Sequence, residues 1–201
     1  MERKKVIIAF GDIRGFTAFT RRAAPEEKID LLRFVYSDFQ RLVDPEKYFV
    51  KYDGDGIMIL KELDHNTKNI EIHDFLIKVY GLGVKVRKSI DNSYPRPDGF
   101  LVRVAMGMSF KMMVKNPYGG KPSKVPEYVD YPVNLAKRLH EVYRTEHTAI
   151  CTGNIGQIIK NSPDSGIIAG ILDKPEIVPH GIDVEDVSDL MWFSHDVMTD
   201  R

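Results

Sequence analysis

The sequence contains a single cysteine, Cys151, among its 201 residues. One cysteine excludes an intrachain disulfide and the thiol cluster of a structural zinc site, and it favours a cytoplasmic protein. No apolar run approaches the roughly 20 residues that span a bilayer, so we expect no membrane segment. Lysine and arginine number 29 together, as do aspartate and glutamate, so no net charge attracts nucleic acid. An anionic ligand would therefore need a local site.

Strand and helix patterns alternate along the chain, and their order predicts the fold class. The expected elements are a strand at 4–10 that breaks at Gly11, a helix at 25–41 with Ile29 and Phe39 on its buried side, strands at 48–52 and 57–60, a helix at about 69–89, a strand at 100–114, a loop at 116–127 and a helix at about 133–144. This is the order of a ferredoxin-like βαββαβ core. We expect an α+β fold, with a mainly antiparallel sheet, helices on one face, and a single domain over residues 1–201.

Two aspartates occupy positions where their carboxylates could converge. Asp12 ends the first strand, and Asp55 lies in the hairpin turn at 53–56. Each has a structural explanation when taken alone, since Asp-Gly turns and helix N-caps both favour aspartate. If the first strand pairs beside the hairpin, however, the two carboxylates meet at one sheet edge. Converging oxygen ligands suit hard cations such as Mg²⁺ or Mn²⁺.

Phosphate oxygens could bind beside this pair of aspartates. The backbone N–H groups of Arg14, Gly15, Phe16 and Thr17 are predicted to lie at a helix N-terminus, where unpaired donors favour anions. Further along the chain, Asn134 and Arg138 are four residues apart and therefore share one face of the last predicted helix. Taken alone, these two would be interpreted as a solvated helix face.

Three motifs together resemble the class III adenylate and guanylate cyclases. Residues 10–17 match Phe-x-Asp-Ile-x-Gly-Phe-Thr, residues 51–55 match Lys-x-x-Gly-Asp, and residues 133–139 match Val-Asn-x-Ala-x-Arg-Leu, in the family's order. The resemblance covers about residues 5–145. It implies an enzyme that closes a nucleoside triphosphate to a 3′,5′-cyclic monophosphate and releases pyrophosphate. Two divalent cations, Mn²⁺ or Mg²⁺, would be held by Asp12, Asp55 and the backbone carbonyl of Ile13.

The resemblance also assigns roles to residues outside the metal site. Asn134 would orient the ribose, and Arg138 would bind the triphosphate and neutralise charge that develops at the α-phosphate. Lys51 and Glu127 would contact the base. In the family, the helix that carries the asparagine and arginine faces the metal site of a partner, so a head-to-tail homodimer with shared sites is implied.

The identity of the base is left open by these motifs. Lys51 agrees with the adenylate pattern, but Glu127 stands where adenylate cyclases typically carry aspartate or threonine. A small register change would place the Tyr52 ring in the base pocket and favour a smaller base, whereas the alternative is a Tyr52 packed as an ordinary strand aromatic. A short stand-alone cyclase also resembles the bacterial pyrimidine cyclases of Pycsar antiphage defence, which make cyclic UMP or cyclic CMP. The alternatives are an adenylate cyclase and a catalytically silent nucleotide-binding module.

Overall fold

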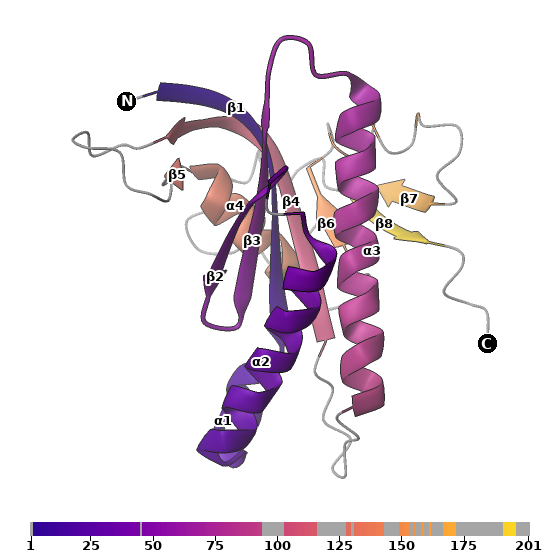
Figure 1. Cartoon of the computed structure of the whole chain (residues 1–201). Coiled ribbons are helices and arrows are strands. Elements are labelled where there is room, and N and C mark those ends of the chain that lie inside the picture. The colour runs from indigo at the N-terminus through magenta and orange to yellow at the C-terminus, as the bar shows by residue number, and fades with distance from the viewer. Residues whose placement is uncertain are drawn as a thin grey trace.

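The computed structural model describes residues 2–44, 46–93, 103–115, 128–129, 131–142, 149–152, 155, 158, 161, 167–171 and 191–195. The elements in chain order are β1 (Glu2–Arg14), α1 (Phe16–Arg22), α2 (Pro25–Leu42), β2 (Phe49–Asp53), β3 (Gly56–Leu63), α3 (Asn69–Ser93), β4 (Arg103–Lys115), β5 (Tyr128–Val129), α4 (Tyr131–Val142), β6 (Ala149–Cys151), β7 (Ile167–Ile171) and β8 (Met191–His195) (Figure 1).

The described strands form one sheet with β1 near its middle. The strand order is β2-β3-β1-β4-β6-β8-β7, and β5 pairs with β4. β1 is antiparallel to both of its neighbours, β3 and β4, while β4 and β6 run parallel. The order of the first four strands is that of a ferredoxin-like βαββαβ unit. The predicted α+β fold with a mainly antiparallel sheet is therefore confirmed.

The side chains of β1 alternate between two apolar layers, one on each face of the sheet. Ile7 and Ile13 belong to the layer that packs under α2 and α3, whereas Val6 and Phe10 belong to the layer under α4. The two helices of the βαββαβ unit thus lie on one face, as predicted. α4 covers the opposite face, so the sheet is buried on both sides at its centre (Figure 1).

α2 shows how the sequence produces this packing. Pro25 occupies the first helical turn, and the backbone N–H of Ala24 donates to the Glu27 carboxylate at 2.7 Å. Leu31, Val35 and Phe39 follow at four-residue intervals, and each is only 1% exposed. Ile29, which the apolar pattern also placed on the buried side, is 49% exposed instead.

Several boundaries differ from those predicted. β1 does not break at Gly11 but continues to Arg14, because it pairs with β3 as far as Asp12 and with β4 as far as Arg14. α3 continues past 89 to Ser93, and α4 begins at 131, two residues earlier than expected. The predicted loop at 116–127 lies outside the described residues.

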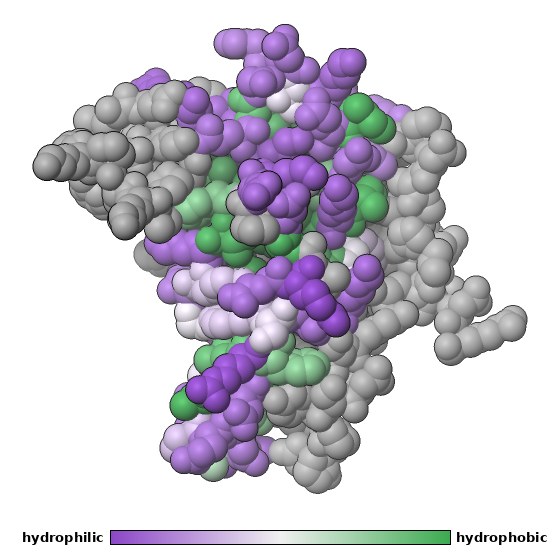
Figure 2. Space-filling view, viewed as in Figure 1, coloured by the Kyte–Doolittle hydropathy of each residue, from purple (hydrophilic) through white to green (hydrophobic). Residues whose placement is uncertain are grey.

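The described surface is mainly polar on the face seen in Figure 2, where hydrophilic side chains surround smaller hydrophobic areas. None of the described helices is both long and apolar enough to cross a membrane.

Gly56 allows the hairpin to approach β1 closely. A Cβ at this position would lie 2.6 Å from Cζ of Phe10, far inside van der Waals contact. The Phe10 ring cannot easily move away, since it is 3% exposed and belongs to the layer under α4. The absence of a side chain at Gly56 therefore fixes how the hairpin lies against β1.

We expect Gly56→Ala to lower the free energy of unfolding by about 1–3 kcal/mol, the usual cost of overpacking a core. Gly81→Ala is the matched control, because a Cβ there meets nothing within 4 Å. It should raise stability by up to about 1 kcal/mol through helix propensity. Urea unfolding measures both changes, and a Gly56→Ala protein as stable as the parent would contradict this packing.

Candidate active site

The β2–β3 hairpin presents Asp55 beside the end of β1. Asp53 pairs with Gly56 across the turn, and Gly54 has a φ of 61°, in the left-handed region that glycine adopts without strain. In the neighbouring ladder, Asp12 of β1 pairs with Gly56. Asp12 therefore lies opposite the residue that follows Asp55. The predicted pairing of the first strand beside the hairpin is confirmed, and it brings the two aspartates together.

The Asp12 carboxyl group lies close enough to Asp55 to affect the ionisation of Asp55. Burial raises the pKa of Asp55 above its ordinary value, and the negative charge of Asp12 and a hydrogen bond between the two side chains raise it further. The Lys137 ammonium acts in the opposite direction, as does a backbone hydrogen bond. A half-buried acidic pair of this kind is destabilised when both members are ionised, and a divalent cation would relieve that repulsion.

The donor set fits a hard divalent cation. Asp12 and Asp55 would supply carboxylate oxygens, and the family resemblance implies the backbone carbonyl of Ile13 as a further oxygen ligand. The described residues contain no group of three or more histidine, cysteine, aspartate or glutamate side chains that could hold a metal. A metal at this position would therefore complete its coordination with backbone, water or substrate oxygens, as Mg²⁺ commonly does.

Tyr36 of α2 holds the turn from the opposite side of the cleft. Its hydroxyl donates a hydrogen bond to the carbonyl oxygen of Gly54. Burial raises the pKa of Tyr36, with further contributions from Asp55 and Asp53, so the hydroxyl stays protonated and remains a donor. The cleft that contains the aspartate pair is lined by Gly11, Asp12, Ile13, Val35, Tyr36, Phe39, Asp55 and Ile57.

Lys137 connects α4 to the same hairpin. Its Nζ lies 3.0 Å from Oδ2 of Asp53 and 5.2 Å from the centre of the Phe10 ring. The side chains of Lys137 and Asp53 are 47% and 62% exposed, so the ion pair itself contributes little stability. Its importance is positional, because it places a cation beside the acidic turn. The sequence analysis did not single out Lys137, although its place between Asn134 and Arg138 on one helix face was a usable signal.

Lys51 and Tyr52, two of the three residues predicted near the base, lie on opposite faces of the sheet. Lys51 pairs with Met58, a residue of the layer under α4, and it is exposed. By alternation Asp12 belongs to the same face, two residues after Phe10. Tyr52 points the other way, toward α2.

Tyr52 is packed as a strand aromatic in this structure. Its ring centre lies 4.4 Å from that of Tyr36, and the pair adjoins the core under α2 and α3. Burial raises the pKa of Tyr52, while a hydrogen bond with Gln40 acts in the opposite direction. The register change that would place the Tyr52 ring in the base pocket instead of Lys51 is not observed in the β2–β3 ladder.

The remaining predicted residues lie directly after β1 or on α4, except Glu127. Gly15, with a φ of 83°, is the N-cap of α1, so Phe16 and Thr17 form its first turn directly after β1. For Arg14 the structure describes only the backbone, as the last residue of β1. Asn134 and Arg138 are exposed on α4. Glu127 lies outside the described residues.

Comparisons with known proteins agree with this geometry. Residues 1–150 match the family model of the adenylate and guanylate cyclase catalytic domain. The structure of the adenylyl cyclase CyaB from P. aeruginosa has a TM-score of 0.74 at 17% identity, covering 96% of this chain and 95% of that one. The guanylyl cyclase Cya2 gives 0.68 at 15% identity, covering 96% and 92%.

A further similar structure is the guanylate cyclase domain of RhGC from Catenaria anguillulae in complex with GTP. Its TM-score is 0.68 at 14% identity, and the match covers 97% of this chain and 99% of that one. No match was found among curated proteins. At these identities the similarity to solved structures shows the fold.

We expect Asp55→Asn to stabilise the metal-free protein and to remove its response to metal. The raised pKa means that ionised Asp55 destabilises the fold above that pKa, and the effect disappears as pH falls toward the ordinary value of 3.8. At pH 7 in chelator, the melting temperature should rise by a few degrees at most, since about 1 kcal/mol corresponds to about 2–4 °C. Added Mn²⁺ should stabilise only the parent.

Thermal unfolding across pH 4–8 provides the measurement, and Asp30→Asn on the exposed side of α2 is the control for loss of a carboxylate. Equal stabilisation of the parent and Asp55→Asn by Mn²⁺ would remove Asp55 from the metal site.

Proposed function

The chain belongs to the family of adenylate and guanylate cyclase catalytic domains, and from this premise we propose that Asp12 and Asp55 form its metal site. Members of the family are nucleotide cyclases that use divalent metal ions. The observation that carries the proposal is the β1–β3 register, which joins the two carboxylates in one half-buried pair. We also propose that residues 1–201 form one cytoplasmic domain of this kind. The near-complete mutual coverage with solved cyclase domains supports that extent.

The bound cations, Mn²⁺ or Mg²⁺, would lower the pKa of the ribose 3′-hydroxyl and balance the charge of the departing pyrophosphate. Asp12, Asp55 and the Ile13 carbonyl supply their oxygen ligands. The backbone N–H groups of residues 14–17, where β1 passes into α1, would face the phosphates. The 3′-oxygen bonds to the α-phosphorus, the bond to the β-phosphate oxygen breaks, and the hydroxyl proton leaves to solvent.

Positioning residues on α4 complete the reaction. Asn134 would hold the ribose in line with the α-phosphorus, and Arg138 would neutralise the charge that develops there. Both lie on the exposed side of α4, as expected for residues that act on another copy of the chain. We therefore propose a head-to-tail homodimer in which each site combines the aspartate pair of one copy with α4 of the other.

Mixing two inactive variants tests the metal site and the shared site together. Asp55→Ala and Arg138→Ala should each lose turnover with all four nucleoside triphosphates in Mn²⁺. Mixed together, they should regain about a quarter of the parent rate, because half of the dimers are hybrid and each hybrid has one intact site.

The mixture of Asp12→Ala with Asp55→Ala is the matched control and should stay inactive, since both changes damage the same half-site. Mass spectrometry confirms that mixed dimers form. Recovery in the control mixture, or none in the test mixture despite mixed dimers, would reject the shared site.

The finer proposal is that the base is a pyrimidine, so that UTP or CTP is converted to cyclic UMP or cyclic CMP in bacterial antiphage signalling. It is supported by Glu127, which departs from the adenylate pattern. The exposed Lys51 on the same face as Asp12 favours the second candidate, an adenylate cyclase. The intact set of Asp12, Asp55, Asn134 and Arg138 favours turnover over a silent nucleotide-binding module.

Rates with ATP, GTP, UTP and CTP should show a pyrimidine preference in the parent. Lys51→Ala should change the ratios between bases, because Lys51 faces the metal site. Tyr52→Ala should instead lower all four rates by about tenfold to a hundredfold, since loss of its ring unpacks Tyr36 and misplaces the Asp55 turn. A parent enzyme that makes mainly cyclic AMP would refute pyrimidine specificity and leave the cyclase intact.

A further inference from the structure

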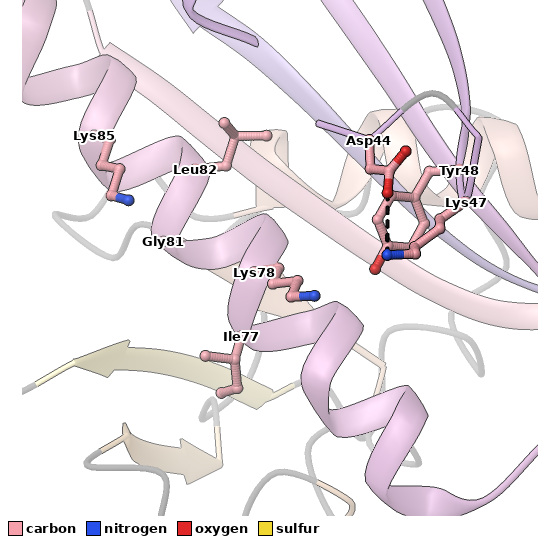
Figure 3. A pocket seen from close by; sticks show the side chains of 8 residues that line it. All are labelled: Asp44, Lys47, Tyr48, Ile77, Lys78, Gly81, Leu82 and Lys85. Atoms are coloured by element: carbon pink, nitrogen blue, oxygen red, sulfur yellow. Dashed lines mark ion pairs between the residues drawn. The ribbon is translucent and has the colours of Figure 1, made fainter. Parts of the chain in front are cut away.

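Another cleft lies between the loop after α2 and the middle of α3, away from the aspartate pair. Its volume is about 320 Å³, and it shares no lining residue with the cleft that contains Asp12 and Asp55. Two short segments form its walls, as Figure 3 shows. The lining residues are Asp44, Lys47, Tyr48, Ile77, Lys78, Gly81, Leu82 and Lys85.

The cleft carries uncompensated positive charge. Lys47 is neutralised by Asp44, whose Oδ2 lies 3.1 Å from the lysine Nζ. Lys78 and Lys85, in contrast, form no ion pair with any residue that the structure describes. The Lys78 side chain points from α3 toward the segment 44–48 (Figure 3). Two ammonium groups therefore lie beside one cavity with no ion-pair partner in the described part of the chain, an arrangement that favours an anion.

The spacing of the α3 residues concentrates this charge on one helix face. Three lining residues of α3 lie three, four and seven positions after Lys78, namely Gly81, Leu82 and Lys85. Residues at these spacings are neighbours on one side of a helix. The two lysines are about 10 Å apart along the axis. Their charges are thus separated by a distance that a small organic molecule can span.

Gly81 lies between the two lysines and keeps the helix backbone open. A Cβ there would meet no atom within 4 Å, so no packing contact requires glycine. Glycine in a helix interior costs up to about 1 kcal/mol relative to alanine. The fold therefore bears a cost at a position where a side chain would extend into the cleft.

Apolar groups form the rest of the wall. Leu82 is 5% exposed, and the Tyr48 ring is held against Phe75 with ring centres 5.3 Å apart. A cavity of this size with apolar walls and a few convergent charges is typical of sites for small organic ligands. A bare inorganic anion would leave these walls without a partner.

We propose that this cleft binds a small organic anion, with its acidic group at Lys78 and Lys85 and an apolar or aromatic body against Leu82 and Tyr48. The site does not depend on the proposed cyclase mechanism, and binding to it can be measured without turnover.

The probe is 8-anilinonaphthalene-1-sulfonate, which combines a sulfonate with an aromatic body and fluoresces when bound. Titration of the folded chain should give saturable binding that weakens with added salt. Lys78→Glu should weaken binding at least about tenfold by opposing the sulfonate, and Gly81→Leu should do so by filling the cavity. Lys68→Glu, the same charge change just before α3, is the matched control and should bind as the parent does.

Circular dichroism confirms that each variant is folded, and Lys78→Glu tests the site even if Gly81→Leu does not fold. Parent-like binding by folded Lys78→Glu would overturn the proposal. Displacement of the probe by Mn²⁺ with inorganic triphosphate would also overturn the proposal, because such competition would place the probe in the cleft that contains Asp12 and Asp55.

Discussion

The antiparallel register between β1 and β3 is the constraint on which the site depends. It sets Asp12 opposite Gly56 and so places two carboxylates at one end of the sheet centre. The apolar core does not contain this pair. The raised pKa of Asp55 means that the fold without metal disfavours the ionised form of Asp55. The surrounding contacts hold the pair in place. Phe10 packs on Gly56 from one face of the sheet, and Tyr36 bonds the turn from the other.

The two faces of the sheet contribute differently to the proposed site. The face under α2 and α3 supplies rigidity, through the main apolar core and the Tyr36–Tyr52 contact. The aspartate pair involves both faces, because Val35, Tyr36 and Phe39 of α2 line its cleft, while Asp12 and Lys51 alternate toward the face under α4. Lys137 joins them by its contacts with Asp53 and Phe10. The proposed shared site uses the face under α4, since α4 presents the exposed side chains of Asn134, Lys137 and Arg138.

Local patterns were sufficient to predict the βαββαβ order and the meeting of the two aspartates. Both depend on alternation and on a hairpin turn, which are encoded within a few residues. Contacts between distant segments could not be predicted in the same way. The Lys137–Asp53 pair joins residues 84 positions apart, and the Tyr36–Gly54 bond joins residues 18 apart. The extension of β1 to Arg14 likewise depends on its pairing with β4, and the lysine cleft exists only where the segment 44–48 meets α3.

The central claim is that Asp12 and Asp55 act as one metal-binding unit. A double-mutant cycle on Mn²⁺ affinity, measured by calorimetry on the chain without nucleotide, tests it most directly. Asp12→Asn and Asp55→Asn should each remove most of the Mn²⁺ affinity. The double variant should lose little more, because the single carboxylate left in either variant binds the cation only weakly. Independent, additive losses from the two changes would contradict the account.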